Sequence, residues 1–187
     1  MITYNEEGRA FWNGVRVPRT TEICVLLAPR EWKADEYYLR KGVLIHRITE
    51  WNDSGELDES TVDPLLRDYL DAYRRFLRDN RFAVISREHK FFHPKYKYCG
   101  RVDMYGRFEA KSWAWVIDIK SGQPHKSDLL QAPAYLFGMK AEGITCHRCG
   151  DLYLLANGNY RFEEVKSPTS RFLTFLGGLK RWKEENK

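Results

Sequence analysis

The first fifty residues alternate short apolar runs with polar turns and then change to a helical period. Residues 11–18 place apolar positions on both sides of an Asn-Gly dipeptide, which is typical of a two-residue hairpin turn. A first helix is expected to begin at residue 20 or 21. A second lies between residues 32 and 51 and is centred on 42–51. The chain therefore opens with a small hairpin followed by helices.

A third helix has a clear start signal. Asp63 before Pro64 is the pattern of a helix N-cap followed by proline in the first turn. The apolar positions that follow recur at helical spacing and predict one buried stripe. Its members are Leu65, Leu66, Tyr69, Leu70, Tyr73, Phe76 and Leu77.

From residue 82 the period becomes two, which favours strands. Strands are expected at residues 82–86, 88–92, 98–108 and 113–120, a helix at 127–141, and strands at 144–156 and 160–165 around a turn at 157–159. Ser167 before Pro168 is expected to cap a last helix, with a buried stripe of Phe172, Leu173, Phe175, Leu176, Leu179 and Trp182. This order predicts one domain over residues 1–187, of α/β (α+β) class, with a mixed central sheet flanked by helices.

Composition agrees with one globular domain. The chain has 187 residues, of which 43% are hydrophobic and 14% aromatic, which is enough for one core. It has no apolar run of the about 18 residues that suggest a membrane span, and no signal peptide is evident at the N-terminus. A cytoplasmic protein without membrane contact is therefore expected. The net charge of +5 favours a polyanionic partner only slightly.

The four cysteines, Cys24, Cys99, Cys146 and Cys149, are expected to be reduced in that compartment. Cys146 and Cys149 form a CxxC pair. A structural zinc site needs further ligands, and none stands at a convincing spacing. The sequence leaves the role of this pair open.

Two of the expected strands, 98–108 and 113–120, place acidic residues across from each other. If their turn centres between residues 110 and 111, Asp103 lies directly opposite Asp118, with the Cβ atoms about 5 Å apart. Lys120 shares that face. Because opposed like charges are destabilising in a half-buried strand pair, a divalent cation, Mg²⁺ or Mn²⁺, is the expected partner. The spacing alone leaves a surface Asp–Asp–Lys salt-bridge trio as the alternative.

Several motifs resemble, in order, those of RecB-like PD-(D/E)XK nucleases, over residues 42–135. They are Gly42-x-x-x-His46 with Glu50, Gly100-Arg101-Val102-Asp103, Val116-Ile117-Asp118-Ile119-Lys120-Ser121-Gly122 and Gln131-x-x-x-Tyr135. The opening hairpin also looks like that of small phage-type members of the family. The resemblance implies a restriction-endonuclease-like core. It also implies a metal held by His46, Asp103, Asp118 and the Ile119 carbonyl, Lys120 as the catalytic lysine, and Gln131 and Tyr135 positioning the DNA or that lysine.

Some positions near these motifs stay ambiguous. Glu50 shares the helix face of His46 and either orients it or is solvated. Glu88 is expected to be a surface glutamate, with a place facing the metal as the alternative. Pro133 is expected to kink its helix or to move the helix start toward Leu130, which would disturb the neighbouring Gln-Tyr pair.

The function that the resemblance implies is a Mg²⁺- or Mn²⁺-dependent deoxyribonuclease. Exonuclease action in recombination, repair or phage-type DNA processing is expected. DNA would be the substrate, and a single-strand annealing or single-strand-binding protein and further copies of the chain are candidate partners. Two alternatives remain: a non-catalytic nucleic-acid-binding module on the same fold, and a structural interaction protein without a nucleic acid partner.

Overall fold

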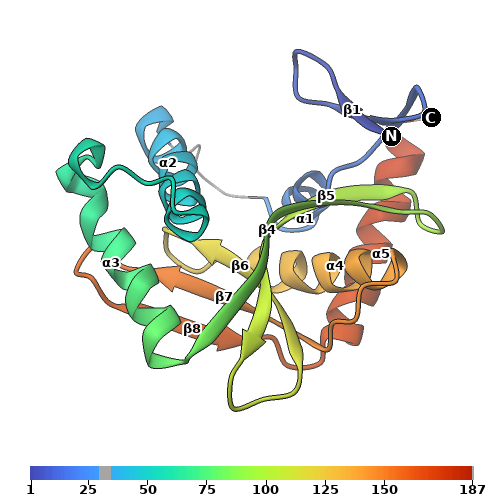
Figure 1. The fold of residues 1–187 in the computed structure, drawn as a ribbon. Coiled ribbons are helices and arrows are strands. Elements are labelled where there is room, and N and C mark those ends of the chain that lie inside the picture. Colours follow the sequence, from blue (N-terminus) through green and yellow to red (C-terminus); the bar gives the residue numbers. More distant parts are fainter. Residues whose placement is uncertain (30–34, 187) are drawn as a thin grey trace.

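The computed structural model describes residues 1–29 and 35–186. Their helices are α1 (Thr20–Leu27), α2 (Glu36–Ser54), α3 (Pro64–Asp79), α4 (Asp128–Ala141) and α5 (Pro168–Glu185), with a short 3-10 turn at Glu59–Thr61. The strands are β1 (Ile2–Tyr4), β2 (Ala10–Trp12), β3 (Val15–Val17), β4 (Phe82–His93), β5 (Tyr98–Phe108), β6 (Ala114–Lys120), β7 (Arg148–Leu154) and β8 (Tyr160–Glu164). Figure 1 shows their arrangement.

The central sheet has five strands in the order β4-β5-β6-β7-β8. Neighbouring strands run antiparallel except β6 and β7, which are parallel. Helices cover both faces (Figure 1): α2 and α3 pack on one apolar cluster, and α1, α4 and α5 pack on the other. The predicted mixed sheet flanked by helices is therefore confirmed.

A second, three-stranded sheet lies at the outer end of β4 and β5. Strands β1, β2 and β3 pair antiparallel in sequence order, so the predicted hairpin is present with one further strand. The Trp12 ring stacks on Phe92 with 4.0 Å between the ring centroids. Arg16 donates to Asn186 Oδ1 at 2.8 Å, which joins this sheet to the C-terminal end of α5.

Local signals fix the helices that carry the site. The Asp63 side chain accepts a hydrogen bond from the Leu65 N–H, and Pro64 occupies the first turn of α3, as predicted. Helix α2 begins after Asp35, whose side chain accepts from the Tyr37 N–H, and ends at Gly55 in a left-handed conformation that glycine adopts without strain. Trp32, the expected limit of that helical region, lies outside the described residues.

The structure differs from the predicted strands in two places. The candidates 82–86 and 88–92 are one strand, β4, in which the pairing with β5 shifts by one residue between Val84 and Ser86. Such a bulge leaves an unpaired residue and interrupts the alternation of sides that defines a strand in a sequence. The strand expected at 144–156 is limited to β7, Arg148–Leu154.

Two residues expected in buried stripes are exposed. Leu65 is 65% exposed at the first turn of α3, and Leu173 is 63% exposed on α5. Leu173 follows the buried Phe172, and successive helix residues are turned by about 100°, so it points away from the core. Ser167 does not cap α5 with its side chain, because its backbone is left-handed at φ 57°. No helix among the described residues is long and apolar enough to cross a membrane.

The helix that carries Gln131 and Tyr135 packs tightly against the sheet. Gly138 of α4 leaves room for Phe91 of β4, since a Cβ at this glycine would stand 2.1 Å from the Phe91 ring. This close contact seats α4 over β4, β5 and β6. Its polar residues therefore face the end of β6.

Candidate metal centre and active site

The site forms where β5 and β6 separate. Their pairing runs from Arg107–Ala114 to Met104–Ile117, and the next step of this register brings Asp103 opposite Asp118. There the Asp103 carboxylate accepts a hydrogen bond from the Ile119 N–H at 2.7 Å. The hairpin thus places two aspartates side by side at the end of the ladder.

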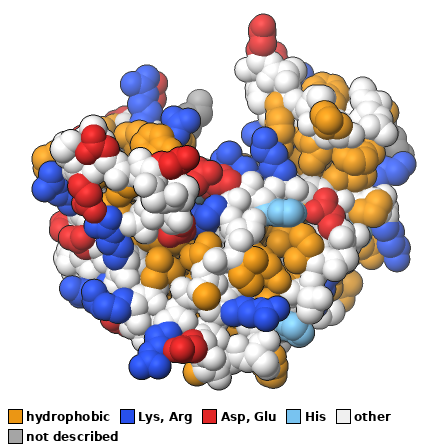
Figure 2. All heavy atoms as spheres, viewed as in Figure 1, with side chains coloured by type: hydrophobic (Ala, Val, Ile, Leu, Met, Phe, Trp, Pro, Cys, Tyr) orange, Lys and Arg blue, Asp and Glu red, His pale blue; other side chains and the backbone are white. Residues whose placement is uncertain are grey.

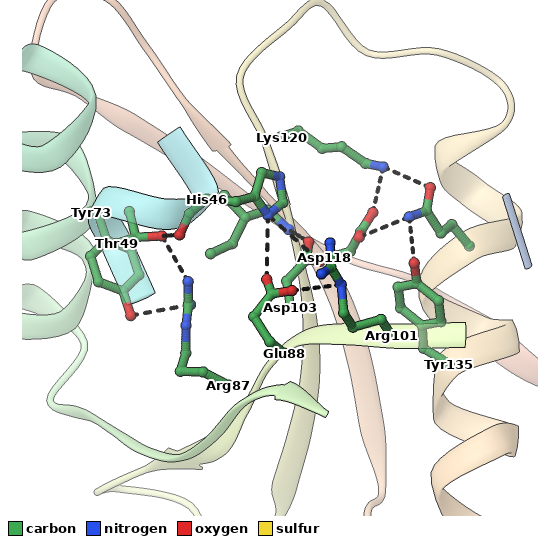
Figure 3. Close-up of polar contacts among 12 residues, drawn as sticks. His46, Thr49, Tyr73, Arg87, Glu88, Arg101, Asp103, Asp118, Lys120 and Tyr135 are labelled. Atoms are coloured by element: carbon green, nitrogen blue, oxygen red, sulfur yellow. Dashed lines mark hydrogen bonds and ion pairs between the residues drawn. The ribbon is translucent and has the colours of Figure 1, made fainter. Parts of the chain in front are cut away.

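A histidine and a glutamate complete one acidic cluster around Asp103 (Figure 3). His46 on α2 approaches from the helix side, with its Nδ1 atom 3.6 Å from Asp103 Oδ1 and 3.9 Å from Glu88 Oε1. One ligand atom from each of these three residues lies within 4.8 Å of the others. Arg101, beside them on β5, forms an ion pair with Glu88, with its Nε atom 2.6 Å from Glu88 Oε2.

Glu88 was expected at the surface, and the structure brings it to the site. Arg87 pairs with Met104 and His89 pairs with Val102, so Glu88 on β4 lies opposite Asp103 on β5. Its backbone is left-handed at φ 51°, a conformation that few residues other than glycine adopt. The only sequence signal for this residue was an acidic side chain in a strand next to the hairpin.

Lys120 stands on the other side of Asp118, held by residues of α4 (Figure 3). Its ammonium contacts Asp118 Oδ2 and donates to Gln131 Oε1 at 2.9 Å. The Gln131 amide in turn donates to Asp118 Oδ1 at 3.1 Å and to the Tyr135 hydroxyl at 2.8 Å. Asp128 Oδ1, which the sequence did not single out, lies 3.5 Å from the Lys120 ammonium.

Pro133 does not disturb this arrangement. Helix α4 starts at Asp128 and continues through the proline, which removes one backbone donor from the helix. The side chains of Gln131 and Tyr135 nonetheless meet as helix positions four residues apart should. The expected shift of the helix start toward Leu130 does not occur.

The structure brings together most of the residues that the sequence nominated. His46, Asp103, Asp118, Lys120, Gln131 and Tyr135 share one site, with the Ile119 backbone inside it. Glu50 lines the same cavity, but within the described chain no hydrogen bond or ion pair joins it to His46. Glu88 and Asp103 are the acidic neighbours of that histidine instead.

Burial of the site disfavours any charge that is not compensated by an opposite charge. Asp118 is only 1% exposed, and desolvation raises the pKa of its carboxyl to about 8, against the opposing effect of Lys120. Desolvation also raises the pKa of Asp103, and it lowers the pKa of His46. The Asp118 carboxylate raises the pKa of Lys120 despite burial. The lysine is therefore an ammonium, while burial disfavours the ionised forms of both aspartates.

The side chains present fit a divalent cation. Carboxylate oxygens are suitable ligands for Mg²⁺ or Mn²⁺, and a neutral imidazole is a common metal ligand. Glu88 Oε1 is buried without a hydrogen-bond partner, and Asp118 Oδ2 has no well-aligned hydrogen bond beyond its contact with the Lys120 ammonium. Buried polar atoms normally have partners. A bound cation would supply partners and compensate the adjacent negative charges.

The site opens into a cavity of about 790 Å³. His46, Glu88 and Asp103 lie in its wall, together with the basic residues Arg19, Arg47, Lys90 and Arg101 and the aromatic residues Tyr4 and Tyr38. Figure 2 shows the surface hollowed between the part formed by α2 and the part formed by β1–β3. Basic and acidic side chains gather at the floor of this hollow. The acidic cluster is therefore reachable from solvent along a basic wall.

Comparisons with known proteins give only weak likenesses. No protein-family model matches the sequence, and a search of curated proteins finds no match. Among solved structures, an alkaline exonuclease (LHK-Exo) from Laribacter hongkongensis is 13% identical with a TM-score of 0.42, and 89% of each chain is covered. The same enzyme in complex with dAMP is 15% identical, with a TM-score of 0.42 and 91% of each chain covered. The structure of SSO0001 is 18% identical, with a TM-score of 0.42 and coverage of 84% of this chain and 72% of that one. These similarities are too weak to assign a function to this chain.

Proposed function

We propose that this protein is a metal-dependent deoxyribonuclease that hydrolyses phosphodiester bonds. One observation carries the proposal: Asp103 and Asp118 lie together at the end of the β5–β6 ladder, with the Lys120 ammonium against Asp118. Taken alone, the trio Asp103, Asp118 and Lys120 is also compatible with a purely structural salt bridge. The presence of His46 and Glu88 on its open side favours a metal centre.

The residues that would hold the ion are His46, Glu88, Asp103, Asp118 and the carbonyl of Ile119. Glu88 joins the set because its Oε1 atom is buried, unpartnered and close to His46. A bound Mg²⁺ or Mn²⁺ supplies Lewis acidity toward a phosphate oxygen and lowers the pKa of a bound water. The protein contributes the fixed, partly buried cage that orients these ligands.

Lys120 would act on the phosphate and on the attacking water. Its ammonium is held by Asp118 and Gln131. The Gln131 amide is in turn oriented by its hydrogen bond to the Tyr135 hydroxyl. A positive group in a poorly solvated site stabilises the negative charge that grows on phosphate oxygens during hydrolysis. It also donates a hydrogen bond that orients a water molecule. Gln131 and Tyr135 are therefore positioning residues for this lysine.

The cavity wall suits a polynucleotide. Arg47 and Lys90 are exposed, and neither forms an ion pair among the described residues. Basic side chains of this kind bind phosphates, and aromatic faces such as those of Tyr4 and Tyr38 can stack on bases. A path along this wall would lead a phosphate to the acidic cluster.

The direct test is a cleavage assay on linear, end-blocked and closed circular DNA with Mg²⁺ or Mn²⁺. The wild-type protein is expected to degrade linear DNA and to stop when EDTA removes the metal. Exonuclease action predicts that closed circles and end-blocked duplexes survive. Metal-independent binding without cleavage of any substrate would contradict the proposal and favour a nucleic-acid-binding module.

The buried aspartates predict a pH-dependent stability that metal reverses. Because the pKa of Asp118 is raised to about 8 from its ordinary 3.8, the folded protein holds a proton that the unfolded chain releases, and stability falls as pH rises between these values. From pH 6 to pH 8 the loss is about 2 kcal/mol, or about 5 °C in Tm.

Thermal unfolding in EDTA and in Mn²⁺ at both pH values measures this effect. Mn²⁺ should raise Tm more at pH 8 than at pH 6, because bound metal favours the ionised carboxylates. A Tm in EDTA that rises over this range, with an equal Mn²⁺ effect at both values, would contradict the assignment of a cation to these aspartates.

A further inference from the structure

An arginine with a largely buried side chain lies directly behind the metal centre. Arg87 precedes Glu88 on β4, and its side chain is 8% exposed. Its guanidinium donates to Thr49 Oγ1 at 2.7 Å and to the Tyr73 hydroxyl at 3.4 Å, and its Nε atom lies 3.4 Å from Asp53 Oδ2. It also lies over the Tyr73 ring, 5.3 Å from the centroid. One side chain thus contacts α2 and α3 from the central sheet (Figure 3).

The contacts on α2 lead directly to His46. The Thr49 hydroxyl, which accepts from Arg87, donates to the His46 carbonyl oxygen at 2.9 Å. Asp53 lies one further turn along the same helix and also accepts a hydrogen bond from the Tyr73 hydroxyl. Arg87 therefore contacts both the turn of α2 that carries His46 and the turn that follows it.

Fold stability is a weak reason for this arrangement. A buried ion pair loses its hydration, and well-packed apolar residues of similar volume often stabilise a fold as well or better. An arginine offers five donors in a rigid planar fork, so it defines a geometry more sharply than an apolar contact can. The wall of the active-site cavity contains His46 and Glu88 but neither Arg87 nor Asp53. Arg87 therefore acts from behind the site.

We propose that Arg87 is a positioning residue for the metal centre, an inference that rests on the proposed function. Through Thr49 and Asp53 it holds α2 against β4 at the spacing that sets His46 beside Glu88 and Asp103. Its own backbone also leads into the left-handed Glu88. A single side chain thereby couples the helix-borne ligand to the ligands borne by the sheet.

The test measures Mn²⁺ binding by titration calorimetry and unfolding by heat, without any activity assay. Arg87→Met and Thr49→Val are each expected to weaken Mn²⁺ binding about tenfold or more, as the loss of residues that orient metal ligands does. Arg87→Lys should recover little, because one ammonium cannot reach both contacts. Thr49→Val keeps shape and the Arg87–Asp53 pair, so it tests the idea even where Arg87→Met does not fold.

Matched controls lie far from the site. Thr174→Val removes a helix hydroxyl that bonds a backbone carbonyl on α5, and Arg148→Met removes the arginine of a surface pair with Glu164. Both are expected to leave Mn²⁺ affinity unchanged. Equal weakening by these controls would overturn the inference, because it would show a general effect of altered stability.

A double-mutant cycle separates positioning through His46 from other effects. In a His46→Ala background, Arg87→Met should weaken Mn²⁺ binding no further, because the ligand it positions is gone. Full additivity would overturn the inference. Equal Mn²⁺ affinity of the wild type and the Arg87→Met variant would also overturn the inference, but it would leave the proposed function intact. A wild type that binds no Mn²⁺ overturns the proposed function and this inference together.

Discussion

Replacing Lys120 with methionine is expected to lower the rate of DNA cleavage about a thousandfold while Mn²⁺ still binds. The ammonium is the positive group nearest to Asp118, and removing one preorganised group that stabilises charge in a transition state costs on the order of 100- to 1000-fold, with proton-transfer roles adding to that. Methionine has a similar length and no charge, so it fills most of the same space. Because the substitution removes the positive charge of the ammonium from beside the metal site, Mn²⁺ affinity should stay the same or rise.

The matched control for this variant is Lys140→Met, on the helix that also carries Gln131. Lys140 is exposed at the end of α4, and its loss removes the same charge from the protein. Cleavage rates at saturating Mn²⁺ and Mn²⁺ titrations of both variants give the answer. Cleavage by Lys120→Met at the wild-type rate would remove the lysine from the mechanism, and loss of Mn²⁺ binding would show that it supports the site structurally.

The β5–β6 part of the site could be predicted from sequence because it depends on local pairing. A hairpin fixes its register by the position of its turn, so the numbers 103 and 118 were enough to place the two aspartates together. The i, i+4 spacing of Gln131 and Tyr135 is equally local. Each of these contacts follows from the period of a single element or a single turn.

The other half of the site depends on contacts between distant segments. Glu88 reaches Asp103 only because β4 carries a bulge between Val84 and Ser86, and a bulge changes which side of the strand each later residue faces. The contact of Arg87 with α2 is made to Thr49, 38 residues away in the sequence. No periodicity within one element encodes such a contact, so Glu88 was expected at the surface.

The cysteines show the same difference between pattern and packing. Cys146 and Cys149 form a motif that can hold metal, but both are buried in the core beneath α4 and α5. Desolvation raises the pKa of Cys146 to about 11, and its thiol lies near the carbonyl oxygens of Leu136 and Ile144. These thiols therefore behave as small apolar residues in this packing.

Asp103→Asn is expected to change metal binding and stability in opposite directions. Asparagine keeps the shape of the side chain and an oxygen that can accept from the Ile119 N–H, so the strand geometry should persist. Without the charge, Mn²⁺ affinity should fall by more than the about 10- to 100-fold that changes behind a ligand cause, and cleavage should fall with it. The protein in EDTA should become more stable at pH 8, since burial raises the pKa of Asp103 and penalises its ionised form.

Glu50→Gln is the matched control, because it removes the same charge from the same cavity wall at a residue whose side chain forms no hydrogen bond or ion pair with His46 in the described chain. It should leave Mn²⁺ binding and the stability in EDTA nearly unchanged. Calorimetry and thermal unfolding at pH 8 compare the two variants directly. A buried carboxylate retained for fold stability would give the reverse pattern, in which Asp103→Asn destabilises the protein and Mn²⁺ affects both variants alike. Opposite signs for stability and for metal affinity at Asp103 alone therefore distinguish a metal ligand from a structural salt bridge.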